Sequence, residues 1–253
     1  MNHKKFIEDT LISATKYSGN MDPFKKEISA SMLGNDMLQI YLKYMNGGKE
    51  SNKFGASEFG SVFHIAAEHI FKDKDNIETE KSMSVMLPNG WKVTGTADLI
   101  LHDYKRIVDW KVSTATTISK VQKEGIHNGY ALQQAVYKYL LYKTENVKYN
   151  ASLAIIDKGY SLFKKTNKTN QLNIIDIDTH TIEDIEALLI EKTNLLQEYI
   201  DAKETPPQCN DLWWFGFGAQ PKKKMRCLHF CDQSNNCPYL TDHNVMKNLL
   251  ENL

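Results

Sequence analysis

The sequence contains little cysteine and arginine, no net charge and no long apolar run. Four cysteines in 253 residues are too few for a small domain built on disulfide bonds. The 31 basic and 31 acidic side chains cancel, so net charge by itself indicates no polyanionic partner. No apolar stretch approaches the roughly 18 residues of a membrane-spanning helix, and the first residues lack the apolar core of a signal peptide. These absences predict a cytoplasmic protein without a membrane partner.

The residues that are present predict an α/β fold. Hydrophobic residues make up 42% of the chain, enough for one large core. A helix start signal at Asp22-Pro23, apolar residues at helical spacing and a stop signal at Asn46-Gly47-Gly48 predict a first helical segment. The same spacing predicts further helices over 57–71, 130–142 and 181–202. Runs typical of strands cover 82–87, 91–101, 107–112, 151–156 and 172–177. The segment with Lys120 and Lys123 is predicted to be a loop. This order indicates a mixed central sheet flanked by helices.

Changes in pattern along the chain predict three parts. An N-terminal helical segment covers residues 1–56, the α/β core covers 57–204, and a tail that carries all four cysteines covers 205–253. The tail follows Pro206-Pro207, which ends the last long helix.

Two acidic residues and a lysine lie on adjacent predicted strands. Side chains alternate along a strand, so Asp109 and Lys111 share one face while Trp110 points to the other. If the turn at 102–105 joins two antiparallel strands, residues whose numbers add to 207 face each other, which places Asp98 opposite Asp109. Their Cβ atoms would then lie about 4.5 to 5.5 Å apart.

Two carboxylates this close repel each other unless a cation lies between them. Oxygen ligands of this kind suit Mg²⁺ or Mn²⁺. Lys111 beside such an ion could position a water molecule and stabilise charge on a phosphate. The alternative is an ordinary surface hairpin with a solvated Asp/Lys pair.

These residues resemble the motif of the PD-(D/E)XK nucleases, and their surroundings resemble the RecB-like and phage-type exonuclease branch. Asp98 followed by Asp109-Trp110-Lys111 is similar to the central motif. Residues 59–68 resemble the branch's first motif with its histidine, 130–141 its Gln-x-x-x-Tyr helix, and 28–33 its serine-rich entry to the first helix. The resemblance covers residues 28–141 in the expected order and implies a restriction-endonuclease-like core.

The resemblance also implies roles for individual residues. Those that match its metal ligands are His64, Asp98, Asp109 and the main-chain carbonyl of Trp110, and Lys111 matches the catalytic lysine. Gln133 and Tyr137 match a pair that contacts DNA near the scissile phosphate, and Lys120 and Lys123 are further candidates for DNA binding. Glu68, one turn beyond His64, either orients the ligands or is a solvated charge. Ala97 stands where the motif has proline.

The tail carries a second candidate metal site. Cys227, Cys231 and Cys237 resemble the C-terminal iron–sulfur triplet of the family, with Cys209 as a fourth ligand and His229 as a weaker substitute. Such a site could hold a 4Fe–4S cluster or Zn²⁺, or the thiols could simply be buried without metal. The first-helix cysteine of iron–sulfur relatives is missing, because Asn35-Asp36-Met37 stands there.

The resemblance predicts a divalent-metal-dependent deoxyribonuclease of phage or recombination and repair type, in a bacterial or phage-infected cell. It favours an exonuclease that leaves 5′-phosphates and works beside a single-strand annealing protein. A structure-specific endonuclease or flap nuclease is one alternative, and a non-catalytic DNA-binding or assembly module is another. The intact set of Asp98, Asp109 and Lys111 argues against the second alternative.

Overall fold

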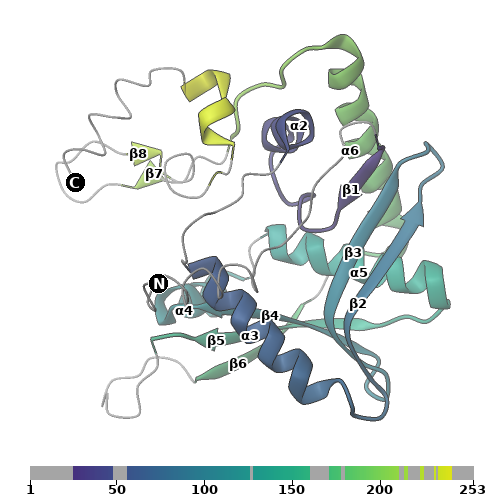
Figure 1. Cartoon of the computed structure of the whole chain (residues 1–253), viewed down its shortest axis with the longest axis vertical. Coiled ribbons are helices and arrows are strands. Elements are labelled where there is room, and N and C mark those ends of the chain that lie inside the picture. The colour runs from purple at the N-terminus through teal and green to yellow at the C-terminus, as the bar shows by residue number, and fades with distance from the viewer. Residues whose placement is uncertain are drawn as a thin grey trace, which may run out of the picture. The chain divides into compact units, whose positions relative to one another are not determined.

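The protein is described from a computed structural model. It covers residues 25–47, 56–125, 128–159, 171–177, 180–210, 214–215, 223–224, 231 and 233–240. Its centre is a six-stranded mixed sheet (Figure 1). The strands are β1 (Glu27–Ser29), β2 (Ile77–Met86), β3 (Lys92–Leu101), β4 (Arg106–Ser113), β5 (Asn150–Asp157) and β6 (Leu172–Ile177). The pairs β1–β3 and β4–β5 are parallel, and the other pairs are antiparallel. The predicted α/β class with a mixed sheet is confirmed.

Strand β3 has three partners, and this arrangement opens the sheet. Strand β2 pairs with it from Lys92 to Leu101 along one edge. On the other edge, β1 pairs with residues 92–94 and β4 pairs only with residues 99–101. Among the described strands, residues 95–98 of β3 therefore have no partner on this edge, and the sheet is open there between the ends of β1 and β4.

Two short turns fix the register of β3. Between β2 and β3, Gly90 takes a left-handed backbone (φ 82°) and donates its N–H to the carbonyl of Leu87 at 3.0 Å. Leu87 in turn donates to the carbonyl of Trp91 at 2.7 Å. Between β3 and β4, Lys105 donates its N–H to the carbonyl of His102 at 3.0 Å. The predicted Asn-Gly hairpin is thus confirmed.

Helices cover both faces of the sheet. Helix α3 (Ala56–Phe71) lies across β4 and the β2–β3 hairpin (Figure 1), and its Phe63 and Phe71 pack on Trp110 with ring centroids 5.6 and 6.2 Å away. On the other face, α4 (Ala115–Glu124) and α5 (Asn128–Glu145) pack on β5. The buried cluster there consists of Ile118, Val121, Ala151, Leu153, Ile155 and Ile177.

Two predicted elements are wrong. Residues 32–36 do not continue a helix: α2 (Met37–Asn46) begins later, and Glu27–Ser29 form β1, whose Ile28 is buried beside Val93. The segment with Lys120 and Lys123 is helix α4, not a loop. Thr114 caps its start by accepting the N–H of Thr117, and Gly125 ends it with φ 87°.

The chain divides into two compact units. The described residues of 27–34 and 51–191 form the first, and those of 19–26, 35–50 and 192–253 form the second. Helix α6 (Ile182–Ala202) begins in the first and ends in the second. The second also contains the strand pair β7 (Trp214–Phe215) and β8 (Lys223–Lys224) and the 3-10 turns η2 (Ser234–Asn236) and η3 (Pro238–Leu240). In the described part of the chain, no helix combines the length and apolar character needed to cross a bilayer.

Candidate active site

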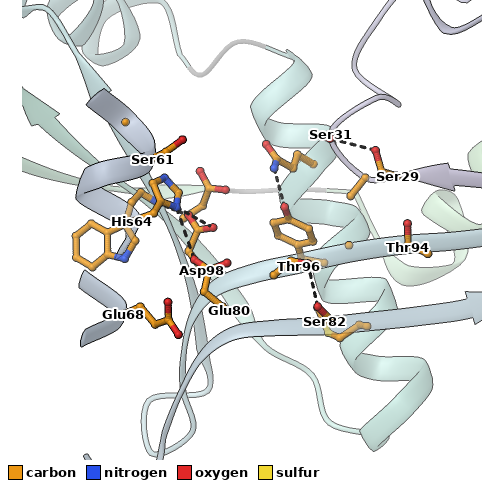
Figure 2. A pocket seen from close by; sticks show the side chains of 18 of the residues that line it. Ser29, Ser31, Ser61, His64, Glu68, Glu80, Ser82, Thr94, Thr96 and Asp98 are labelled. Atoms are coloured by element: carbon orange, nitrogen blue, oxygen red, sulfur yellow. Dashed lines mark hydrogen bonds and ion pairs between the residues drawn. The ribbon is translucent and has the colours of Figure 1, made fainter. Parts of the chain in front are cut away.

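A cavity of about 850 Å³ opens beside residues 95–98 of β3, and it lies entirely within the first compact unit. This volume falls in the range of sites for small ligands. The predicted site residues that line it are His64, Glu68, Asp98, Asp109, Trp110, Lys111, Gln133 and Tyr137. The structure therefore brings together residues from α3, β3, β4 and α5 that are distant in sequence (Figure 2).

The predicted register of β3 and β4 is correct, but the ladder stops one pair before Asp98 and Asp109. Leu99 pairs with Val108, and the two strands diverge from there. The side chain of Asp98 connects the two strands beyond this point, because its Oδ2 accepts the backbone N–H of Trp110 at 2.8 Å. The carboxylate is therefore held between the strands, with Oδ1 turned toward α3.

Asp109 and Lys111 form a half-buried ion pair. Lys111 Nζ lies 2.6 Å from Asp109 Oδ2, and the Asp109 side chain is only 1% exposed. Apart from this contact, neither oxygen of Asp109 has a hydrogen-bond partner among the described residues. Burial raises the pKa of Asp109 to about 6, although Lys111 opposes the shift. Burial alone would lower the pKa of Lys111, but Asp109 and Asp98 outweigh it and raise that pKa.

His64 faces two carboxylates. Its Nδ1 lies 3.5 Å from Asp98 Oδ1 and 3.8 Å from Glu80 Oε1 (Figure 2). Hydrogen bonding to Asp98 and then to Glu80 raises the pKa of His64 to about 10, against the opposing effect of burial. Without a bound cation, the imidazole is thus protonated at neutral pH.

Glu80 is the site residue that the sequence reasoning missed. It lies in β2, lines the cavity and is directed toward His64 and Asp98 (Figure 2). Register arithmetic could have found it. The Pro88-Asn89-Gly90 turn pairs residues whose numbers add to 178, as Thr79 with Leu99, and this places Glu80 opposite Asp98.

Gln133 and Tyr137 form a pair on α5. Gln133 donates from Nε2 to the Tyr137 hydroxyl at 2.7 Å, and Tyr137 is only 4% exposed. Gly95 makes this packing possible. A Cβ atom at that position would lie 2.8 Å from Tyr137 Cε1 and 3.1 Å from Leu140 Cδ1. The glycine of β3 therefore lets the tyrosine ring rest directly on the sheet.

Comparison with known proteins identifies the family. Residues 75–239, more than half of the chain, match the model of the PD-(D/E)XK nuclease superfamily. The chain belongs to this superfamily. The match confirms the predicted resemblance, and it covers Asp98, Asp109 and Lys111 of the expected motif. No curated protein is recognisably similar in sequence to this nuclease family member.

Several solved structures are similar to this chain. The crystal structure of SSO0001 is 16% identical, covers 94% of this chain and 97% of its own, and has a TM-score of 0.55. At this identity the likeness shows the fold alone. LHK-Exo, an alkaline exonuclease from Laribacter hongkongensis, is 15% identical, with 70% and 93% coverage and a TM-score of 0.46. A phage related exonuclease from Haemophilus somnus is 16% identical, with 70% and 94% coverage and a TM-score of 0.34.

The residues present fit the divalent cation that the PD-(D/E)XK family implies. Asp109 carries two buried oxygens without hydrogen-bond partners, and Asp98 lies beside it on the next strand. Within the described residues, His64, Glu80 and Asp98 also form a group whose potential ligand atoms all lie within 4.8 Å of one another. Carboxylate oxygens with one imidazole suit Mn²⁺ and Mg²⁺.

Other predicted site residues lie elsewhere. Lys120 and Lys123 are exposed on α4 and are not among the residues that line the cavity. Cys209, Cys231 and Cys237 are partly exposed and in no disulfide bond within the described part of the chain, and Cys227 lies outside it. No cysteine joins a potential metal-binding group among the described residues. Iron–sulfur or zinc binding in the tail stays a prediction.

Replacing Gly95 by alanine is expected to destabilise this nuclease fold by about 1 to 3 kcal/mol, because the new methyl group overpacks the buried Tyr137 ring. Displacing Tyr137 should also break its hydrogen bond to Gln133. Gly60→Ala in α3 is the matched control. A Cβ there meets nothing within 4 Å, so the variant should gain about 0.5 to 1 kcal/mol of helix stability. Thermal and urea unfolding measure both, and equal effects of the same sign would contradict the packing argument.

Proposed function

We propose that this protein is a divalent-metal-dependent deoxyribonuclease, an exonuclease that hydrolyses DNA to products with 5′-phosphates. The observation that carries the proposal is the meeting of His64, Asp98, Asp109 and Lys111 around one cavity. Membership of the PD-(D/E)XK superfamily supports nuclease chemistry. The four motifs of the exonuclease branch, in order between residues 28 and 141, favour an exonuclease.

The cation would be held by His64, Asp98, Asp109 and the main-chain carbonyl of Trp110. When bound, it would act as a Lewis acid toward the phosphate and lower the pKa of a water molecule. The remaining contributions come from the chain. Asp98 is fixed by the N–H of Trp110, so it presents its other oxygen to the cavity. Asp109 is buried and supplies a carboxylate whose oxygens lack hydrogen-bond partners among the described residues.

Lys111 would stabilise the negative charge that develops during the reaction. Asp109 and Asp98 keep its ammonium protonated, and it lines the cavity at 2.6 Å from Asp109. A fixed positive charge stabilises the negative charge that grows on the phosphate as water attacks. The oxygen of water bonds to phosphorus and the bond to the 3′-oxygen breaks. One product thus ends in a 3′-hydroxyl and the other in a 5′-phosphate.

Hydroxyl side chains line the cavity beyond the carboxylates and would contact the DNA backbone. Ser82 and Thr96 are 3.2 Å apart, and Ser29 and Ser31 are 3.1 Å apart (Figure 2). Hydroxyl groups commonly donate to phosphate oxygens in protein–DNA complexes. The Gln133–Tyr137 pair lines the same cavity and would position the strand that is cut. An annealing protein as partner stays a prediction.

The test uses linear duplexes labelled at either end and a closed circular duplex, each with Mg²⁺ or Mn²⁺. We expect degradation of the linear DNA from an end, an intact circle, and products with 5′-phosphates. Chelation of the cation should stop the reaction. If the circle is cut as fast as the linear DNA, the protein is an endonuclease. If no DNA is cut with either cation, the proposed activity is wrong.

A further inference from the structure

The ammonium group of Lys111 has an aromatic neighbour in addition to its carboxylate partner. Lys111 Nζ lies over the ring of Tyr130, 5.4 Å from the ring centroid. A cation within about 6 Å of an aromatic face is attracted by the negative face of the ring. Tyr130 belongs to the first turn of α5 and is 36% exposed. The lysine of β4 is therefore contacted from two elements, by Asp109 of its own strand and by Tyr130 of α5.

The backbone next to Tyr130 is closely packed. Gly129, the residue before it, lies against Gly34, and a Cβ atom on Gly34 would lie only 2.6 Å from Gly129 Cα. Gly34 follows β1 in the chain, and both glycines belong to the first compact unit. Two backbones without side chains thus meet at the start of α5. This contact fixes the point from which the Tyr130 side chain extends.

A long side chain such as that of Lys111 needs more than one contact to hold its charge in one place, because fixing its stem costs rotamer entropy. In the proposed function Asp109 also holds the cation, so Lys111 must share the negative charge of that carboxylate. A neutral ring differs from a further carboxylate in two respects. It is a poor ligand for Mg²⁺ or Mn²⁺, and it attracts the ammonium without cancelling the positive charge that a phosphate requires.

We propose that Tyr130 is a positioning residue, whose aromatic ring holds the ammonium of Lys111 at the cavity. The inference rests on the proposed function for the role of Lys111 in DNA cleavage. Lys111 lines the cavity, whereas Tyr130 itself is not one of the described residues that line it. The effect of Tyr130 on the reaction therefore passes through Lys111.

The contact is tested first without DNA or metal, by nuclear magnetic resonance on protein that carries isotope-labelled lysine. The ε-methylene signals that disappear in Lys111→Ala belong to Lys111, and the Tyr130 ring should shift them upfield. Tyr130→Phe should keep this shift, and Tyr130→Leu should lose it. Tyr142→Leu is the matched control, because Tyr142 lies in the same helix with Lys148 over its ring at 6.0 Å, outside the cavity lining. It should leave the Lys111 signals in place, and circular dichroism checks that every variant is folded.

The second test measures single-turnover DNA cleavage and DNA affinity separately. Tyr130→Leu should cut about 3- to 30-fold more slowly, the range expected for the loss of one cation–π contact, with unchanged DNA affinity. Tyr130→Phe should recover most of the rate, and Tyr142→Leu should match the wild type. In protein that already carries Lys111→Ala, Tyr130→Leu should have no further effect, because the group that the ring holds is gone.

Several results would overturn the proposal. An unshifted Lys111 signal in the wild type, or a shift that persists in Tyr130→Leu, means that the ring does not hold the ammonium. If Tyr130→Phe is as slow as Tyr130→Leu, the hydroxyl group acts and not the ring. If Tyr130→Leu slows cleavage equally with and without Lys111, Tyr130 acts on the DNA directly.

The two tests also separate this proposal from the proposed nuclease activity. If the wild type cuts no DNA but the Lys111 signal depends on the ring, the nuclease activity is wrong and the ring does hold the lysine. If the wild type cuts DNA and Tyr130→Leu cuts equally fast, the positioning role alone is wrong.

Discussion

Lys111→Ala is expected to slow DNA cleavage by about 100- to 1000-fold, the cost of removing one fixed group that stabilises developing charge. Lys111 Nζ lies 2.6 Å from Asp109 in the cavity, whereas Lys92, the other lysine of the cavity lining among the described residues, pairs with Glu27. Single-turnover rates at saturating Mg²⁺ measure the loss. Because these rates follow chemistry after binding, weaker DNA affinity would not imitate the effect.

The same variant should change the pH profile of its residual activity. Lys111 lowers the pKa of Asp109 against the larger effect of burial, so removing it should raise that pKa further above about 6. An ionised Asp109 is needed, and activity should then fail at a higher pH than in the wild type. Lys148→Ala is the control, since Lys148 precedes β5 and contacts Tyr142 outside the cavity lining. If Lys111→Ala slows DNA cleavage no more than Lys148→Ala does, Lys111 has no catalytic role.

Mn²⁺ affinity is expected to rise about tenfold per pH unit between about pH 6.5 and 8.5, because the imidazole of His64 must lose its proton before it can bind a cation. The pKa of His64 is raised to about 10 by Asp98 and then Glu80, so the protonated form dominates through this window. Protons and Mn²⁺ therefore compete for the imidazole of His64. This competition weakens as the pH approaches about 10, the pKa of the imidazole. Each binding event should accordingly release about one proton.

Calorimetry in buffers of different ionisation enthalpy measures both the affinity and the released proton. His64→Asn should bind Mn²⁺ more weakly and with little pH dependence in this window, because the titrating group is gone. His102→Asn should keep the wild-type slope, since His102 bonds to Glu78 and Tyr149 outside the cavity lining. An equally steep slope in His64→Asn would show that another group carries the proton.

The sequence allowed prediction of the residues of β3 and β4 that meet, because turn length and alternation determine which side chains face each other. Asp98, Asp109 and Lys111 follow from that rule alone. Glu80 obeys the same rule across the preceding hairpin, but the prediction considered only one of the two ladders. Its left-handed backbone depends on tertiary packing and has no sequence signal.

Two elements escaped prediction for different physical reasons. Strand β1 is only three residues long, and its stability comes from pairing with β3 and burial of Ile28 rather than from its own propensity. Helix α4 is mostly polar, with Ile118 and Val121 as its buried contacts. Its capping residues Thr114 and Gly125 were visible in the sequence. The divergence of β4 from β3, which opens the cavity, results from competition between strands for one edge.

The geometry of the candidate active site depends on the two turns that flank β3 as much as on the carboxylates. Glu80 and Asp98 face each other because of the turn at Gly90, and Asp98 and Asp109 approach because of the turn at Lys105. A strand that slips by one residue presents its other face. In this fold an insertion or deletion in either exposed turn would therefore act like the loss of a catalytic residue, although it leaves every ligand in the sequence. A change in the length of either turn would thus separate Glu80, Asp98 and Asp109 without replacing any of them.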